Sequence, residues 1–239
     1  MIIFIRGKDG SLIMKKKARI ISMFLTFALV FTMLIIPGVD QVKADNLKEV
    51  KYSKSIVIST GNPSVYVNLG KKWNKKKALI IKSSNKKVVK TMDTGYPIVD
   101  LKKAGKATVT FKTGGKTYKM KFKVLAYKNP LKAFEVDSNR VAGSFNNYSS
   151  SSLNYTDETA AIQVKPNKGW KLKSIKYKAY KYENDSVTRY SENIENNSSI
   201  TFKDNSWYSH YILVTLYNSS KGLKETIELE VNRVPDDND

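Results

Sequence analysis

The side chains most often used in catalysis are scarce in this chain. His210 is the single histidine, and there is no cysteine. A histidine cluster for a catalytic metal and a cysteine-histidine pair are therefore excluded. His210 follows Trp207, Tyr208 and Ser209 and precedes Tyr211. This aromatic-rich start of a strand favours a structural histidine over a general base.

Carboxylates are more numerous, but their spacing does not indicate a catalytic pair. A glycosidase needs two carboxylates that converge across a cleft. The acids of the second half are scattered in turns or along a terminal strand, as expected of a solvated face: Asp157, Glu158, Glu183, Asp185, Glu225, Glu228 and Glu230. No glycine-rich phosphate loop or calcium loop is present in the sequence. We expect a non-enzymatic chain without metal or cofactor, and a hydrolase with an unrecognised carboxylate pair is the least favoured alternative.

Lysines suggest a binding surface instead. One predicted turn places five lysines around a tryptophan: Lys71, Lys72, Trp73, Lys75, Lys76 and Lys77. Further lysines alternate along a strand or lie in loops: Lys119, Lys121, Lys123, Lys86, Lys87, Lys102, Lys103 and Lys106. Together they form a broad positive field suited to diffuse attraction of a polyanion. The alternative is that these lysines keep a β-sandwich soluble and protect its edges.

The positive charge belongs to one half of the chain. Residues 45–128 hold 21 lysines, no arginine and four acids, a net charge of +17. Residues 129–239 hold 14 basic and 15 acidic residues, a net charge of −1. Asn129-Pro130 lies at the change and favours an extended linker or turn. We therefore expect two domains, residues 45–128 and residues 129–239.

Residues 45–128 are predicted to be β throughout, because short apolar or alternating segments are separated by Gly, Asn, Pro and Ser. The predicted strands cover residues 56–59, 65–69, 78–82, 88–92, 98–101, 107–113 and 118–125. Strands at this spacing are typical of a sandwich. The last two form a hairpin around Gly114-Gly115. On the second of them, Met120 and Phe122 are expected to face the core, and Lys119, Lys121 and Lys123 to face solvent.

Several segments of this half resemble one known family. They are Ser83-Ser84-Asn85-Lys86-Lys87-Val88-Val89, Gly95, Val99, Lys102-Lys103-Ala104-Gly105-Lys106-Ala107-Thr108-Val109-Thr110, Gly114-Gly115-Lys116-Thr117-Tyr118 and Phe122-Lys123-Val124. Over about residues 50–127 they resemble the group 2 bacterial immunoglobulin-like domain, a small sandwich of invasin- and intimin-type adhesins and of secreted Gram-positive proteins. The resemblance implies a spacer or adhesive module without catalytic residues.

Residues 129–239 are also predicted to be β, with strands at residues 160–165, 172–182, 199–202, 211–217 and 226–231. Within this half, residues 166–177 and 213–231 resemble immunoglobulin- or fibronectin-type modules of secreted Gram-positive proteins. The whole is then all-β, two tandem immunoglobulin-like sandwiches. The polar residues 144–152 are expected to form a long loop or a mobile tip.

An aromatic surface is the second candidate binding site. On the strand at residues 172–182, Ile175, Tyr177 and Ala179 share one face, and Tyr180 and Tyr182 share the other. If the first set is core, the two tyrosines are exposed and suited to stacking on a sugar ring or a protein partner. The alternative is a cross-strand pair that stabilises the sheet.

The N-terminal residues have the layout of a secretory signal. Three lysines and Arg19 precede seventeen uncharged residues, 20–36, which end at Pro37-Gly38. Val42-Lys43-Ala44 suits a signal peptidase, so residues 1–44 are predicted to be the signal peptide, with Met14 as the true start. The alternative is an uncleaved anchor, at the short limit for crossing a bilayer.

These features together predict a secreted or cell-wall-associated protein of a Gram-positive bacterium. The leading function is non-catalytic adhesion or interaction, with an anionic wall polymer or another extracellular polyanion as partner. A glycan or a surface protein is a further candidate partner, and the competing function is a carbohydrate-binding accessory protein. Nucleic acid is not expected as a partner in vivo, and membrane contact is expected only through the signal peptide.

Overall fold

A computed structural model describes residues 47–73, 77–92, 94–183, 186–203 and 208–233. The predicted signal peptide, residues 1–44, lies outside this part of the chain. The described residues belong to one unit, Leu47–Asp239. No helix within the described ranges is long and apolar enough to cross a membrane.

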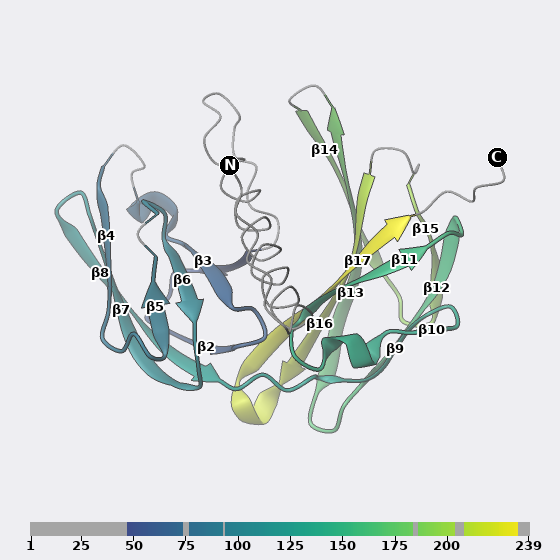
Figure 1. Cartoon of the computed structure of the whole chain (residues 1–239), viewed down its shortest axis with the longest axis horizontal. Helices are drawn as coiled ribbons and strands as arrows, with labels where there is room; N and C mark the ends of the chain where they lie inside the picture. The colour runs from purple at the N-terminus through teal and green to yellow at the C-terminus, as the bar shows by residue number, and fades with distance from the viewer. Residues whose placement is uncertain (1–46, 74–76, 93, 184–185, 204–207, 234–239) are drawn as a thin grey trace, which may run out of the picture. The chain divides into compact units, whose positions relative to one another are not determined.

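Strands form almost all the regular structure of the described residues (Figure 1). The helical elements described are short 3-10 turns: η1 (Gly70–Lys72), η2 (Ala142–Phe145) and η3 (Ser219–Lys221). The strands assemble into sandwich domains, so the prediction of an all-β fold is confirmed.

Two four-stranded sheets contain the first half of the chain. Their strands are β1 (Lys48–Lys51), β2 (Ser55–Ser59), β3 (Ser64–Asn68), β4 (Leu79–Ser83), β5 (Val89–Thr91), β6 (Ile98–Leu101), β7 (Gly105–Thr113) and β8 (Lys116–Leu125). One sheet has the order β1-β3-β6-β5 and the other β2-β8-β7-β4. Strands β1 and β2 pair parallel with β3 and β8, whereas the other neighbours are antiparallel.

Alternation along the strands places apolar side chains between these two sheets. Val65 and Val99 come from one sheet, and Phe111, Met120 and Phe122 from the other, and all five are buried. The turn between β7 and β8 uses Gly114 and Gly115 at φ 57° and 76°. Residues other than glycine rarely adopt this backbone conformation, so the two glycines fix the register of the hairpin.

Two further sheets contain the second half. Their strands are β9 (Leu131–Val136), β10 (Asn139–Arg140), β11 (Ser150–Tyr155), β12 (Thr159–Pro166), β13 (Lys171–Glu183), β14 (Ser186–Ile194), β15 (Ser198–Thr201), β16 (Tyr208–Asn218) and β17 (Leu223–Arg233). The orders are β10-β9-β12-β15 and β11-β17-β16-β13-β14. A second cluster of buried side chains, including Phe134, Ile162, Tyr177, Ile212 and Leu229, lies between them.

The expectation of a long loop or mobile tip at residues 144–152 is wrong for most of that segment. Phe145 ends η2, is fully buried and stacks on Phe134 with ring centroids 6.0 Å apart. Ser150 begins β11, which pairs parallel with β17. Backbone hydrogen bonds hold this edge strand, so its serines need no apolar partner.

Candidate polyanion-binding surface

The outer side of the sheet β2-β8-β7-β4 carries six lysines around two threonines. We call this surface the lysine face, and it consists of Lys82, Lys106, Lys112, Lys119, Lys121, Lys123, Thr108 and Thr110. All six lysines are exposed, and both threonines are half-buried. The residues between them on β7 and β8, such as Val109, Phe111 and Phe122, point inward and are buried. Strand alternation therefore separates a basic face from an apolar face.

The register of the strands fixes how the basic groups are arranged. Lys106 stands directly opposite Lys123, Thr108 opposite Lys121, and Thr110 opposite Lys119. Lys82 on β4 is opposite Thr110 from the other side, so Thr110 lies between two lysines. Neighbouring strands are about 4.8 Å apart, and every second residue of a strand recurs after about 6.7 Å. The lysines thus form a lattice with short spacings.

No acid neutralises this lattice from its own sheet. The sequences of β2, β4, β7 and β8 contain neither aspartate nor glutamate. None of the six lysines forms an ion pair with another described residue. The opposite sheet differs, because Lys102 Nζ lies 3.0 Å from Asp100 Oδ2 there. Among the strands of the sandwich, the uncompensated charge is concentrated on one sheet.

The tryptophan of the predicted basic turn does not project into solvent. Trp73 packs against the first core, and its ring meets Tyr96 edge-on with centroids 5.8 Å apart. Lys71 and Lys72 are exposed on η1, and Lys72 Nζ lies 5.3 Å from the ring centroid of Tyr52. Lys77 runs beside Gly114 in the β7-β8 turn. Lys75 and Lys76 lie outside the described residues.

Contacts of Tyr52 connect this turn with the strand that carries Lys119. The Tyr52 hydroxyl donates to the backbone carbonyl of Lys119 over 3.1 Å. The Tyr52 ring also packs edge-on against Tyr118, with centroids 6.0 Å apart. The basic turn and the lysine face are thus linked by an aromatic contact at β8. Charge is the property that the turn can contribute to binding, since its tryptophan is used in packing.

Of the two tyrosines of the predicted aromatic surface, the structure describes the side chain of Tyr180. Ile175, Tyr177 and Ala179 are buried, so Tyr180 faces the other side of the sheet as the alternation predicts. Tyr180 is half-buried, and its ring packs edge-on against Tyr211 with centroids 5.7 Å apart. This is a cross-strand aromatic contact of the kind that stabilises sheets. Tyr182 lies in β13, but its side chain is outside the described part.

His210 is a core residue. It is 1% exposed, and its Nδ1 lies 2.9 Å from the Tyr177 hydroxyl. The backbone N–H of Lys203 donates to the same hydroxyl over 2.9 Å. Burial, with a smaller contribution from Arg233, lowers the pKa of His210 to about 4. A neutral histidine packed among aromatic rings fits the structural interpretation.

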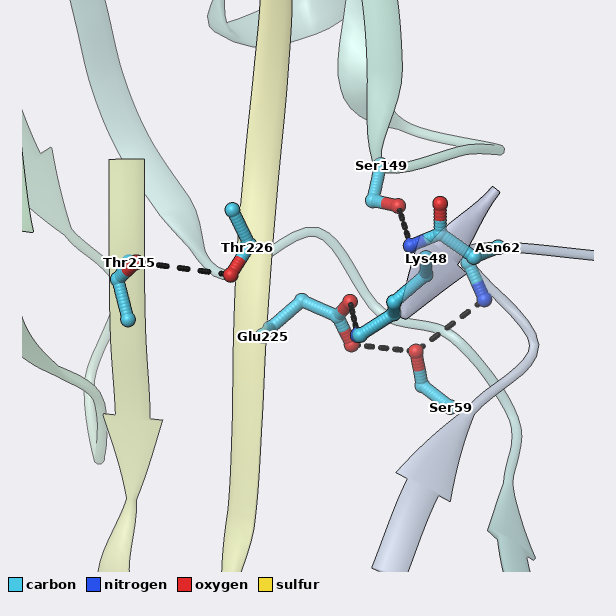
Figure 2. A network of polar contacts seen from close by, with 8 residues as sticks. Lys48, Ser59, Asn62, Ser149, Thr215, Glu225 and Thr226 are labelled. Carbon is cyan, nitrogen blue, oxygen red and sulfur yellow. Dashed lines mark hydrogen bonds and ion pairs between the residues drawn. The ribbon is translucent and has the colours of Figure 1, made fainter. Parts of the chain in front are cut away.

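Glu225 corrects the expectation that the terminal-strand acids lie on a solvated face. Its side chain extends from β17 toward the first half of the chain and is only 1% exposed (Figure 2). Lys48 Nζ donates to Glu225 Oε1 over 2.9 Å, and the Ser59 hydroxyl donates to Oε2. Alternation places Glu225 at an inward-facing position of Leu223–Arg233, but a glutamate there is interpreted as solvated unless its partners from distant strands are known.

A second set of hydrogen bonds lies beside Glu225. Asn62 Nδ2 donates to Ser149 Oγ over 2.5 Å, and the Ser149 N–H donates to the Gly61 carbonyl over 3.0 Å. The Gly61 N–H donates to Ser59 Oγ over 3.2 Å. Figure 2 shows the side chains of this network meeting between β17 and the end of β2. We call Lys48, Ser59, Asn62, Ser149 and Glu225 the junction network.

Metal binding finds no support in the described residues, because no three His, Asp or Glu side chains there are grouped to hold an ion. The candidate functional surface is therefore electrostatic. Sequence reasoning identified Lys119, Lys121 and Lys123, and it placed Lys106 among the loop lysines. It did not single out Lys82, Lys112, Thr108 or Thr110, which become neighbours only through the β4-β7 and β7-β8 registers.

Comparison with known proteins does not assign the chain to a family. No family model matches it, and no curated protein sequence matches it. Among solved structures, domains 5-6 of the S-layer protein SbsC match at 15% identity and a TM-score of 0.24, covering 76% of this chain and 95% of that one. Domains 1-6 of the same protein match at 12% identity and a TM-score of 0.27, covering 73% of this chain, which spans 22% of that structure.

A human protein matches with a TM-score similar to that of the S-layer domains. Human protocadherin-24 EC1-2 matches at 11% identity and a TM-score of 0.24, covering 76% of this chain and 95% of that one. TM-scores of this size do not define a family or a function for this chain. The group 2 bacterial immunoglobulin-like assignment stays a prediction.

Proposed function

We propose that this chain is an exported, non-catalytic module of a Gram-positive cell envelope that attaches to anionic wall polymers through its first sandwich. The observation that carries the proposal is the lysine face, on which six exposed lysines have no acidic neighbour within the sheet. Such a surface attracts a polyanion over a distance of about one Debye length, roughly 8 Å at physiological ionic strength.

The arrangement of the lysines also favours binding over solubility. Solubility requires dispersed charge of both signs, whereas here Lys106 and Lys123 stand directly opposite each other on neighbouring strands. Like charges in this position destabilise a sheet. A function that uses the positive charge explains why the Lys106–Lys123 pair is present although it weakens the sheet.

Sedimentation with purified walls tests the proposal. The chain from residue 45 to residue 239 is mixed with Gram-positive walls, before and after the teichoic acids are stripped, across a series of salt concentrations. We expect the protein to pellet with intact walls at low salt, to be released as salt rises, and to stay in solution with stripped walls. Equal pelleting with both wall preparations, or none with either, would refute attachment to an anionic wall polymer.

A further inference from the structure

The chemical groups on the lysine face restrict what it can recognise. Outward positions of β7 and β8 hold lysine and threonine: Lys106, Thr108, Thr110, Lys112, Thr117, Lys119, Lys121 and Lys123. Across these described strands no aromatic ring points outward, since Phe111 and Phe122 are buried in the first core and Tyr118 packs against it. These positions therefore offer ammonium groups and hydroxyls and no aromatic stacking surface, and the exposed apolar side chain beside them is Ile80 of β4, opposite Lys112.

Absence of outward rings on these strands argues against ligands that bind through planar groups. Bases of single-stranded nucleic acid gain about 1–3 kcal/mol each by stacking on aromatic side chains, and sugar rings use the same kind of platform. No arginine occurs in the four strands either, so the planar two-point grip on a single anion is missing. The remaining attraction acts on anionic groups along a polymer, whatever units connect them.

Thr108 and Thr110 add a directional element to this attraction. They lie two residues apart on the outward side of β7, with Lys121 and Lys119 opposite them on β8. Each hydroxyl can donate one hydrogen bond, and threonine hydroxyls are common donors to phosphate oxygens. Because threonine is shorter than lysine, the two hydroxyls form a floor between the ammonium groups. An anion held by the lysines can thus reach a hydroxyl donor at the same time.

We infer that the lysine face binds a phosphodiester polymer through its backbone, with Thr108 and Thr110 donating to phosphate oxygens and with no recognition of the groups between the phosphates. This inference rests on the proposed function and names the class of polymer. A chain lying along the strands meets a lysine about every 6.7 Å on β8, from Lys119 through Lys121 to Lys123. Compact ammonium groups act on phosphate as point charges and do not demand one orientation.

Comparison of two phosphodiester oligomers tests the lack of group recognition. Fluorescence anisotropy would compare an oligothymidylate with an abasic deoxyribose phosphodiester of equal length, both titrated with the chain from residue 45 to residue 239. We expect dissociation constants that agree within about twofold, because no ring of the face is available for stacking. A preference of about tenfold or more for the oligothymidylate would overturn the inference in favour of nucleic-acid recognition.

Removal of the two hydroxyls tests their role as donors. Thr108→Val with Thr110→Val keeps the shape and β-branching of both side chains, and we expect about 3- to 10-fold weaker binding of the abasic phosphodiester. The control is Thr215→Val with Thr226→Val on β16 and β17, where the two hydroxyl oxygens lie 3.5 Å apart (Figure 2). This control should bind as tightly as the unmodified chain. Circular dichroism would check that both variants are folded.

The outcomes separate this inference from the proposed function. If the unmodified chain pellets with walls as described but the Thr108→Val, Thr110→Val variant binds the abasic phosphodiester unchanged, the hydroxyl contribution is refuted and the wall attachment stands. If the chain pellets with walls but does not bind the abasic phosphodiester, the polymer class is wrong. If it neither pellets nor binds the abasic phosphodiester, both the proposed function and this inference are overturned.

Discussion

Tyr177 and His210 form a buried hydrogen bond within the second core. The Tyr177 hydroxyl accepts from the Lys203 N–H, and its oxygen lies 2.9 Å from Nδ1 of His210. Burial lowers the pKa of His210 to about 4, so the histidine is neutral at pH 7. Burial also raises the pKa of Tyr177 to about 12, so the hydroxyl keeps its proton at neutral pH. The pair is therefore a structural contact that depends on pH.

Stability should fall in acid because of His210. The folded pKa is lowered to about 4, whereas an unfolded histidine titrates near 6.5. As the pH falls from about 6.5 to about 4, His210 is protonated in the unfolded state but stays unprotonated in the folded state. The free energy of unfolding then drops by up to about 1.4 kcal/mol per pH unit from this group.

Urea unfolding at several pH values, with His210→Phe as the comparison, checks this expectation. Acidic side chains titrate in both proteins, so the difference between the two unfolding free energies isolates the histidine. We expect the unmodified chain to lose stability relative to the variant between pH 6.5 and pH 4. Parallel profiles over this range would contradict a neutral buried histidine.

Prediction from sequence at the residue scale worked where alternation was regular. Tyr177 was expected to share one face of its strand with Ile175 and Ala179, and all three are buried. Glu225 was not recognised as buried, since a carboxylate at an inward position becomes favourable only when Lys48 and Ser59 arrive from strands far away in sequence. Pairing over such a distance leaves no local pattern.

At the scale of elements, the lysines of the lysine face that favour polyanion binding also lower the stability of the β7-β8 strand pair. Lys106 and Lys123 are directly opposite on β7 and β8, and Lys112 is opposite Thr117. Changing Lys106→Glu converts a like-charge pair into an opposite-charge pair, which should stabilise the sheet by about 0.5–1 kcal/mol. The same change should weaken binding of polyphosphate, because two units of positive charge leave the face.

Lys112→Glu is the matched control for this prediction. It makes the same change of charge on the same strand and face, but threonine stands opposite, so the stabilisation should be smaller. Thermal unfolding and polyphosphate titration of both variants provide the measurement. If Lys106→Glu is no more stable than Lys112→Glu, the register does not impose a like-charge cost.

The elements recovered from sequence share a physical property. Strands β6, β7, β8, β13 and β16 carry regular apolar alternation or a compact apolar run, and each was expected at nearly its observed position. Strands β1, β9, β10, β11 and β14 were not predicted. β11 is an edge strand held by parallel pairing to β17, and β14 is an edge strand beside β13. Backbone hydrogen bonds hold such edges with little apolar burial, so their sequences resemble loops.

For the whole molecule, the junction network ties the two halves of the chain together within Leu47–Asp239. Glu225 accepts from Lys48 and Ser59, while Ser149 joins Asn62 and Gly61. Removing one partner of a fully buried ion pair leaves the other charge unpaired and costs about 3–5 kcal/mol. Loss of Glu225 leaves Lys48, whose side chain is 17% exposed and can reach water, so the cost here is below that range.

Glu225→Ala should therefore uncouple the two halves. We expect calorimetry to show a single unfolding transition for the unmodified chain and two separate transitions for the variant, with a lower temperature for the first. Arg140→Gln is the control, because Arg140 pairs with Glu135 at the surface and its loss should cost less than about 1 kcal/mol. A single transition at an unchanged temperature in Glu225→Ala would show that the junction network does not couple them.

The most direct test of the lysine face compares two variants with the same net charge. Lys121→Gln with Lys123→Gln removes two lysines from the face, and Lys51→Gln with Lys90→Gln removes two exposed lysines from the opposite sheet of the same sandwich. Binding of inorganic polyphosphate is measured across a salt series. The quantity compared is the slope of the logarithm of affinity against the logarithm of salt concentration, which is negative. We expect this slope to become shallower by about 1.4 for the first variant, roughly 0.7 for each lost contact. For the second variant we expect an unchanged slope. Equal effects of the two variants would mean that net charge alone governs binding, and would contradict a binding site on the lysine face.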